Sequence, residues 1–254
     1  MLDLKYNGKK FISPAKKKKL FNIYNGLYEL MNKINSKKGN NAEIQKQIFE
    51  NKLIEVFREY PELLYINTDE LNKSFLYHAI GNNYFNFVKE MLQNEEVCKM
   101  SIWSNVSVIE DLLVYTKDEK YHNIAYQAIN TFPRLLRSTI CGNGFNLGMQ
   151  LCDREKLTDI QAKIVYMTIE DEIACLQTSP KGNNIGMLCA KYKKQEFFEK
   201  AFKNPRARLQ RNKDGDNMEM MAQKNGLIIP PLTEKEVREF YEESISKQID
   251  ELCK

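Results

Sequence analysis

Residues with the chemistry for catalysis are scarce in this sequence of 254 residues. It has only two histidines, His78 and His122, and no glycine-rich loop with the spacing that binds nucleotide phosphates. The segment nearest to a calcium loop, Asn212–Met220, lacks the acidic ligand expected at the twelfth position of such a loop. We therefore predict a protein that is not an enzyme and that uses no metal or cofactor.

Cysteine pairs and long apolar runs are missing as well. The six cysteines are Cys98, Cys141, Cys152, Cys175, Cys189 and Cys253. They form no C-x-x-C pair and have no metal-ligand spacing, which favours reduced thiols in a cytosol-like compartment. No run approaches the roughly 18 apolar residues that a membrane span needs, and the first residues contain no apolar leader. We expect a cytoplasmic protein without a membrane span; secretion as an effector into a host cell stays open as an alternative.

Positive charge is concentrated near the N-terminus. Residues 1–40 carry ten lysines against two carboxylates, a net charge of +8, while the whole chain has +4, so the remaining residues have −4. A mildly acidic body argues against a surface that coats nucleic acid. Four of the lysines, Lys16, Lys17, Lys18 and Lys19, fall in the first turn of a predicted helix, where cations oppose the helix dipole. They form a patch for an anionic partner or are ordinary solvated lysines.

A glycine turn recurs along the chain. The segments GFNLGMQLC, GNNIGMLCA and GDNMEMMAQ start at Gly144, Gly182 and Gly215, and each has Asn in third place and Met in sixth. Weaker copies start near residues 39, 72 and 105, so successive starts are 33 to 39 residues apart. A repeat period of this size is typical of stacked supersecondary units.

Each unit has the periodicity of two helices. One apolar stripe follows the glycine turn, and a second stripe follows a short polar break. Pro61, Pro133 and Pro205 precede three of the starts by ten or eleven residues and mark the end of the second helix. Because a two-helix unit cannot bury its apolar face alone, we expect neighbouring units to stack.

These units resemble ankyrin repeats. The likeness covers residues 39–232 and rests on the two-helix period of about 33 residues, the glycine in first place, an amide or hydroxyl residue in third and a small residue in eighth. The sequence departs from the family pattern G-x-T-P-L-H-x-A-A, because Asn or Ser replaces the Thr and no proline follows it. The resemblance implies an all-α helical-repeat solenoid; another two-helix solenoid is the structural alternative. Cys189 takes the small-residue place of its unit, which predicts a packed thiol rather than a nucleophile.

Capping helices are expected at both ends of the repeats. A basic arm over residues 1–12 precedes a predicted helix over residues 13–38, which Ser13 and Pro14 start. Residues 233–254 form the other capping helix, with Thr233 as its N-cap and Glu236 as the capping-box partner. About six units fill residues 39–232, with starts near residues 39, 72, 105, 144, 182 and 215.

Candidate binding residues lie in the connectors between units. The resemblance places these connectors in a row on one side of the stack, and arginine suits the recognition of carboxylate or phosphate. The connector arginines are Arg134, Arg137, Arg206, Arg208 and Arg211. Trp103, the only tryptophan, lies in a similar connector and is either a buried anchor or a contact residue.

The predicted function is a scaffold or adaptor that binds a protein partner through repeat loops and inner helices. The alternative is a nucleic-acid-binding protein that uses the basic N-terminal arm together with the arginines of the connectors.

Overall fold

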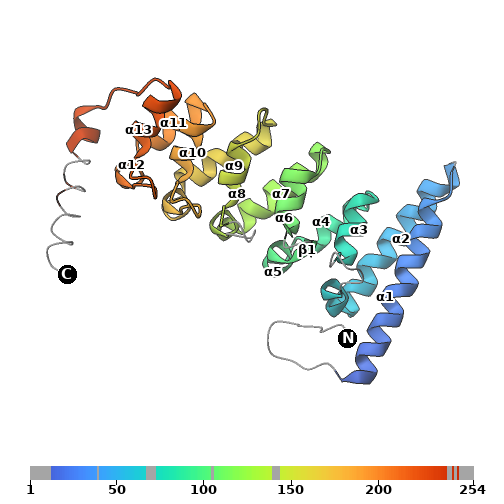
Figure 1. Cartoon of the computed structure of the whole chain (residues 1–254). Helices are drawn as coiled ribbons and strands as arrows, with labels where there is room; N and C mark the ends of the chain where they lie inside the picture. The colour runs from blue at the N-terminus through green and yellow to red at the C-terminus, as the bar shows by residue number, and fades with distance from the viewer. Residues whose placement is uncertain are drawn as a thin grey trace. The chain divides into compact units, whose positions relative to one another are not determined.

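The computed structural model describes residues 13–38, 40–66, 73–103, 106–138 and 144–238, together with residues 242 and 245. The predicted basic arm over residues 1–12 and most of the predicted C-terminal helix lie outside the described residues. The chain divides into two compact units, unit 1 over residues 1–112 and unit 2 over residues 113–254. It is mostly helical with few strands, which confirms the predicted all-α class (Figure 1).

Unit 1 consists of helices and one short antiparallel strand pair, β1–β2. Its elements are α1 (Pro14–Asn35), α2 (Asn40–Glu59), η1 (Pro61–Tyr65), α3 (Phe75–Gly81), α4 (Phe85–Met91), α5 (Glu95–Lys99), β1 (Ser101–Trp103), β2 (Val106–Ser107) and α6 (Val108–Glu110). The Ser13 side chain accepts a hydrogen bond from the N–H of Lys16 at 3.3 Å, and Pro14 occupies the first helical position, as the sequence predicts.

Aromatic rings fill the core of unit 1. Phe57 lies 5.0 Å from Phe75 and 4.9 Å from Phe87 between ring centroids, so α2, α3 and α4 meet at these three rings. Glu50 is buried, and its carboxylate accepts the N–H of Phe87 at 2.9 Å. It therefore caps α4, which has no side-chain cap of its own.

Unit 2 is built from helix pairs and short helical turns. Its elements are α7 (Glu119–Thr131), η3 (Pro133–Arg137), α8 (Leu147–Cys152), α9 (Asp159–Glu170), η4 (Ala174–Leu176), α10 (Ile185–Lys191), α11 (Gln195–Phe202), α12 (Pro205–Leu209) and α13 (Met218–Asn225). The turn η2 (Asp111–Tyr115) crosses the boundary between the two units in the sequence. Helices α8 and α9 pack as one pair and α10 and α11 as the next, and α10 also packs against α8 and α13.

The three glycine turns predicted to be equivalent share their local geometry. Gly144, Gly182 and Gly215 have φ values of 72°, 81° and 82°, a left-handed conformation that favours glycine. The asparagine two residues later caps the following helix in each case, because its Oδ1 accepts the N–H three residues on at 2.9–3.0 Å. Ser74 and Ser107 do the same in the copies near residues 72 and 105, where they cap α3 and α6. The segment that follows residue 39 forms the single long helix α2 and not the predicted pair of helices.

The last two turns also contact each other. In the turns over residues 179–182 and 212–215, the glycine N–H donates to the carbonyl of the first residue at 2.8 and 3.0 Å. The N–H of Lys213 then donates to the carbonyl of Lys181 at 3.0 Å. A Cβ on Gly182 would lie 3.0 Å from the backbone of residues 212 and 213, so this close approach requires glycine.

The predicted packing role of Cys189 is confirmed by its burial. The side chain is fully buried, and its Sγ lies 3.4 Å from the Sγ of Cys152, which is also buried. Burial raises the pKa of the Cys189 thiol well above its ordinary value, and contact with Cys152 adds to this effect. At the C-terminal end the predicted capping box is present, since the N–H of Thr233 donates to Glu236 at 2.8 Å and the N–H of Glu236 to Thr233 at 3.3 Å.

Of the helices that the structure describes, none is both long enough and apolar enough to cross a bilayer.

Two glycines inside helices should respond differently to an added methyl group. A Cβ on Gly148 would lie 2.4 Å from Oγ1 of Thr168, which is fixed by its hydrogen bond to the carbonyl of Ile164. A Cβ on Gly186 would meet the flexible end of Met218 at 2.4 Å. We expect Gly148→Ala to lower the free energy of unfolding by about 2 kcal/mol, because overpacking exceeds the gain in helix propensity. Gly186→Ala should stay near the wild type in urea unfolding; equal losses in both variants would contradict this packing.

Candidate partner-binding surfaces

Four rings of unit 1 form a continuous half-buried row, the aromatic row, made of Tyr28, Tyr77, His78 and Trp103. The ring centroids of Tyr28 and His78 are 4.8 Å apart. Those of Tyr77 and His78 are 5.5 Å apart, and those of Tyr77 and Trp103 are 6.1 Å apart. All three contacts are edge-to-face, which is a favourable arrangement of aromatic rings. The row thus joins α1, α3 and β1 while part of each ring stays accessible.

A buried carboxylate, that of Asp111, holds the Trp103 indole in place. Its Nε1–H donates to Oδ1 of Asp111 at 2.8 Å, and the Asp111 carboxyl is only 6% exposed. Burial raises the pKa of Asp111, the Trp103 hydrogen bond opposes this shift, and the charge of Glu110 adds to it. The indole is therefore fixed at its nitrogen and Trp103 as a whole is half-buried, which agrees with the anchor interpretation; its contact with a partner stays a prediction.

Side-chain amides hold the three connectors of unit 2, the segments around η3, η4 and α12, in fixed positions relative to one another. Nδ2 of Asn146 donates to the carbonyl of Ala174 at 3.0 Å and to Oε1 of Gln177 at 2.9 Å. Nε2 of Gln177 donates in turn to the carbonyl of Arg137 at 2.5 Å. One amide pair therefore ties the start of α8 to η4 and η4 to η3.

The same arrangement is repeated one unit later. Nδ2 of Asn184 donates to the carbonyl of Ala207 and to Oε1 of Gln210, both at 2.7 Å, and Nε2 of Gln210 donates to the carbonyl of Leu176 at 2.9 Å. Gln177 and Gln210 were not among the residues singled out in the sequence. Their position 33 residues apart, each directly after a connector turn, is the signal that would have found them.

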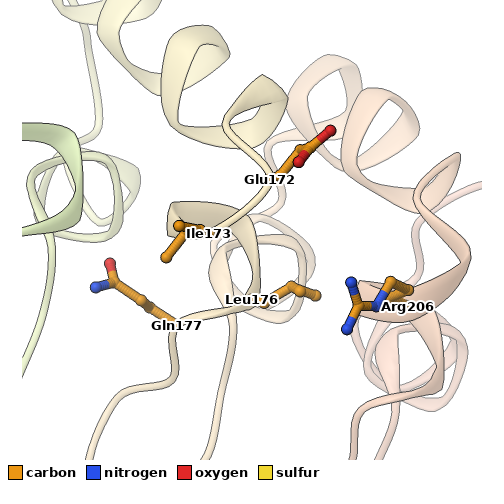
Figure 2. Close-up of a pocket in the computed structure, with 5 residues that line it drawn as sticks. All are labelled: Glu172, Ile173, Leu176, Gln177 and Arg206. Atoms are coloured by element: carbon orange, nitrogen blue, oxygen red, sulfur yellow. The ribbon is translucent and has the colours of Figure 1, made fainter. Parts of the chain in front are cut away.

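The second and third connectors enclose a shallow hollow of about 420 Å³, the connector hollow (Figure 2). Its lining residues are Glu172, Ile173, Leu176, Gln177 and Arg206. Figure 2 shows Arg206 of α12 facing the turn that carries Ile173 and Leu176. Ile173 is 52% exposed, although hydrogen bonds to Asp171 fix the turn around it.

The predicted connector arginines have different environments. Arg137 binds Asp171 through two nitrogens, with Nε–Oδ1 3.0 Å and Nη2–Oδ2 2.9 Å. Arg211 donates to the carbonyl of Gly215 at 2.7 Å. Arg134 and Arg206 are exposed, and only Arg206 lines the connector hollow.

Arg208, by contrast, is buried within unit 2. Its side chain is 5% exposed, and its guanidinium lies 5.1 Å from the ring centroid of Phe202. Burial lowers its pKa, while the charges of Glu219 and Glu236 act in the opposite direction. In this structure Arg208 is not accessible to a partner, so the binding role predicted for it has no surface to act from.

The lysines of the predicted anionic-partner patch are partly engaged within unit 1. Nζ of Lys16 lies 2.6 Å from Oε1 of Glu62 and lowers the pKa of that carboxyl. Nζ of Lys19 donates to the hydroxyl of Tyr60 at 3.1 Å and lies 4.9 Å from the centroid of its ring. Lys17 is half-buried and Lys18 is exposed.

The two histidines belong to different units. His78 belongs to the aromatic row of unit 1, whereas His122 lies in α7 of unit 2 and is 2% exposed. Nε2 of His122 donates to the carbonyl of Thr116 at 2.9 Å, which leaves Nδ1 to accept from the hydroxyl of Thr158 at 3.3 Å. The ring therefore links α7 to the N-terminus of α9, a structural task.

No protein-family model matches this chain, and no curated protein does.

The Asp171 carboxylate should make stability depend on pH. Burial alone would raise its pKa, but Arg137 and the N–H groups of Ala174 and Ile173 outweigh burial and lower it. A lowered folded-state pKa stabilises the fold above the ordinary carboxyl value of about 4, and this stabilisation is lost as the pH falls through the folded pKa. Asp171→Asn should therefore unfold at lower urea concentration than the wild type at pH 7, and the gap should close in acid.

The matched control for this experiment is Glu155→Gln, at an exposed carboxylate of the same unit. It should follow the wild type at every pH. A gap between Asp171→Asn and the wild type that stays constant down to pH 2 would contradict the ionic account.

Proposed function

We propose that this chain is an ankyrin-like, non-enzymatic scaffold or adaptor that binds a protein partner through the aromatic row of unit 1. The observation that carries the proposal is the row itself, in which three separate elements fix accessible rings of Tyr28, Tyr77 and Trp103. Tryptophan and tyrosine are enriched among the residues that dominate binding energy in protein interfaces. Rings that are already ordered cost less entropy when a partner binds.

The placement of the row supports this function. Tyr77 and His78 lie on α3, the first helix of its predicted repeat unit, and Trp103 lies in the strand pair that precedes the next unit. Loop and first helix are the two parts of a unit that we expect a partner to contact. The recurring asparagine and serine caps support the ankyrin-like interpretation, since the third position has one role in the units that start near residues 72, 105, 144, 182 and 215.

A protein partner fits the charges of unit 1 better than nucleic acid does. Lys16 and Lys19 already contact Glu62 and Tyr60 within unit 1, which reduces the positive charge that the lysine cluster offers to a phosphate backbone. Unspecific binding to a phosphate backbone depends on many available cations. Beside the aromatic row, Nζ of Lys73 lies 5.1 Å from the centroid of the Tyr77 ring.

The double variant Tyr28→Ser/Tyr77→Ser tests the proposed function while Trp103 remains as a reporter. Full-length wild type should retain a protein partner from nuclease-treated extract of the source cell, and the variant should retain at least tenfold less, the order expected for loss of hot-spot residues (about 2 kcal/mol). Because Trp103 is the only tryptophan, its emission should change when the purified partner is added to the wild type and stay constant in the variant.

The matched control is Tyr115→Ser/Tyr192→Ser, two tyrosines outside the aromatic row. It should capture the partner and show the emission change as the wild type does. Equal capture by Tyr28→Ser/Tyr77→Ser with an unchanged helical circular-dichroism signal would overturn the proposal, and so would capture that nuclease abolishes.

A further inference from the structure

The three connectors of unit 2 carry an excess of positive charge. Over residues 133–138, 171–177 and 204–211, here called the connector face, five arginines accompany only two carboxylates, Asp171 and Glu172. Asp171 is bound to a connector arginine, and Arg208 is buried. The charges that face solvent are therefore those of Arg134, Arg206, Arg211 and Glu172. A surface with this balance is complementary to an acidic partner.

The connector hollow adds an apolar floor to this basic surface. Ile173 is 52% exposed and Leu176 is half-buried beside it, in a hollow of about 420 Å³. Sites for small molecules bury most of their ligand, whereas here three of the five lining residues are exposed. A shallow site of this kind fits one side chain of a longer segment, as in recognition of extended peptides.

The lining residues favour a protein segment over nucleic acid. None of the five lining residues is aromatic, so the hollow offers no ring on which a base could stack. Glu172 also lines the hollow, so a side chain that enters the hollow itself should be uncharged, and acidic groups of a partner must lie beside the arginines. An aliphatic side chain, by contrast, gains free energy from covering Ile173 and Leu176.

We propose that the connector face binds an extended acidic segment of a partner protein, with one aliphatic side chain of that segment in the connector hollow. Carboxylates of the segment pair with Arg134 and Arg206, and the aliphatic side chain covers Ile173. The side-chain amides of Asn146 and Asn184 keep the three connectors in position before the segment binds. The proposal rests on the proposed function in one respect, that the partner is a protein, and it concerns a surface in a different unit.

A phage-displayed library of random extended peptides, selected on the full-length chain, tests this proposal without knowledge of the partner. Selected peptides should be enriched in Asp and Glu on either side of Leu, Ile or Met. With a fluorescently labelled selected peptide, Ile173→Ser should raise the dissociation constant about tenfold, because most of one aliphatic contact is lost. Arg206→Glu should raise the dissociation constant at least as much, and the difference from the wild type should diminish at high salt.

Two control variants of unit 2 match these changes in chemistry but lie outside the connector hollow. Ile228→Ser removes another exposed isoleucine, 73% exposed, and Lys156→Glu reverses another exposed cation. Both should bind the peptide as the wild type does. Peptides without acidic and aliphatic enrichment, or peptides that bind Ile173→Ser as tightly as the wild type, would overturn the proposal.

Two further outcomes separate the possible causes of failure. Binding of single-stranded RNA that Arg206→Glu weakens but Ile173→Ser leaves unchanged would assign the face to nucleic acid and overturn the proposal. If no peptide is selected while the aromatic-row control and variant still differ in partner capture, the connector-face proposal fails and the proposed function stands.

Discussion

One type of residue connects the local and the long-range structure of unit 2: the asparagine in third place after the glycine turn. Oδ1 of Asn184 caps α10, while its Nδ2 bonds the next connector at Ala207 and Gln210. Asn146 does the same for α8 and the connector at Ala174. Because a buried amide left without partners is costly, the helix start and the connector are fixed together. A threonine hydroxyl could cap the helix, but it would lack the two N–H donors that reach the connector.

This double role of the asparagine explains how the connectors of unit 2 can form an ordered surface with an exposed apolar residue. The glycine before each asparagine sets the turn, the asparagine positions the connector, and a glutamine passes the constraint to the preceding connector. A connector fixed in this way can leave Ile173 exposed beside Arg206 without collapsing over it. In unit 1 a buried carboxyl acts comparably, since Asp111 fixes Trp103 while part of the indole faces solvent.

The sequence was sufficient for features that depend on neighbouring residues. The helical class, the start of α1 at Ser13 and the Thr233–Glu236 capping box follow from local patterns. Features that depend on contacts 23 to 40 residues apart were missed, among them the amide hydrogen bonds between connectors and the connector hollow. Arg208 illustrates the gap: alignment of the connectors places it with Leu136 and Cys175, which are both buried, so its burial was readable only once the connectors were compared position by position.

The substitution Asn184→Asp separates the two tasks of the asparagine amide, the cap of the helix and the bond to the next connector. The carboxylate keeps an oxygen for the cap of α10 but loses the N–H groups that bond Ala207 and Gln210 and repels that carbonyl. Amide hydrogen exchange over residues 205–211 should accelerate strongly while the far-ultraviolet circular dichroism stays helical, and unfolding should cost about 2 kcal/mol less. Exchange over residues 205–211 that matches the wild type would contradict the coupling.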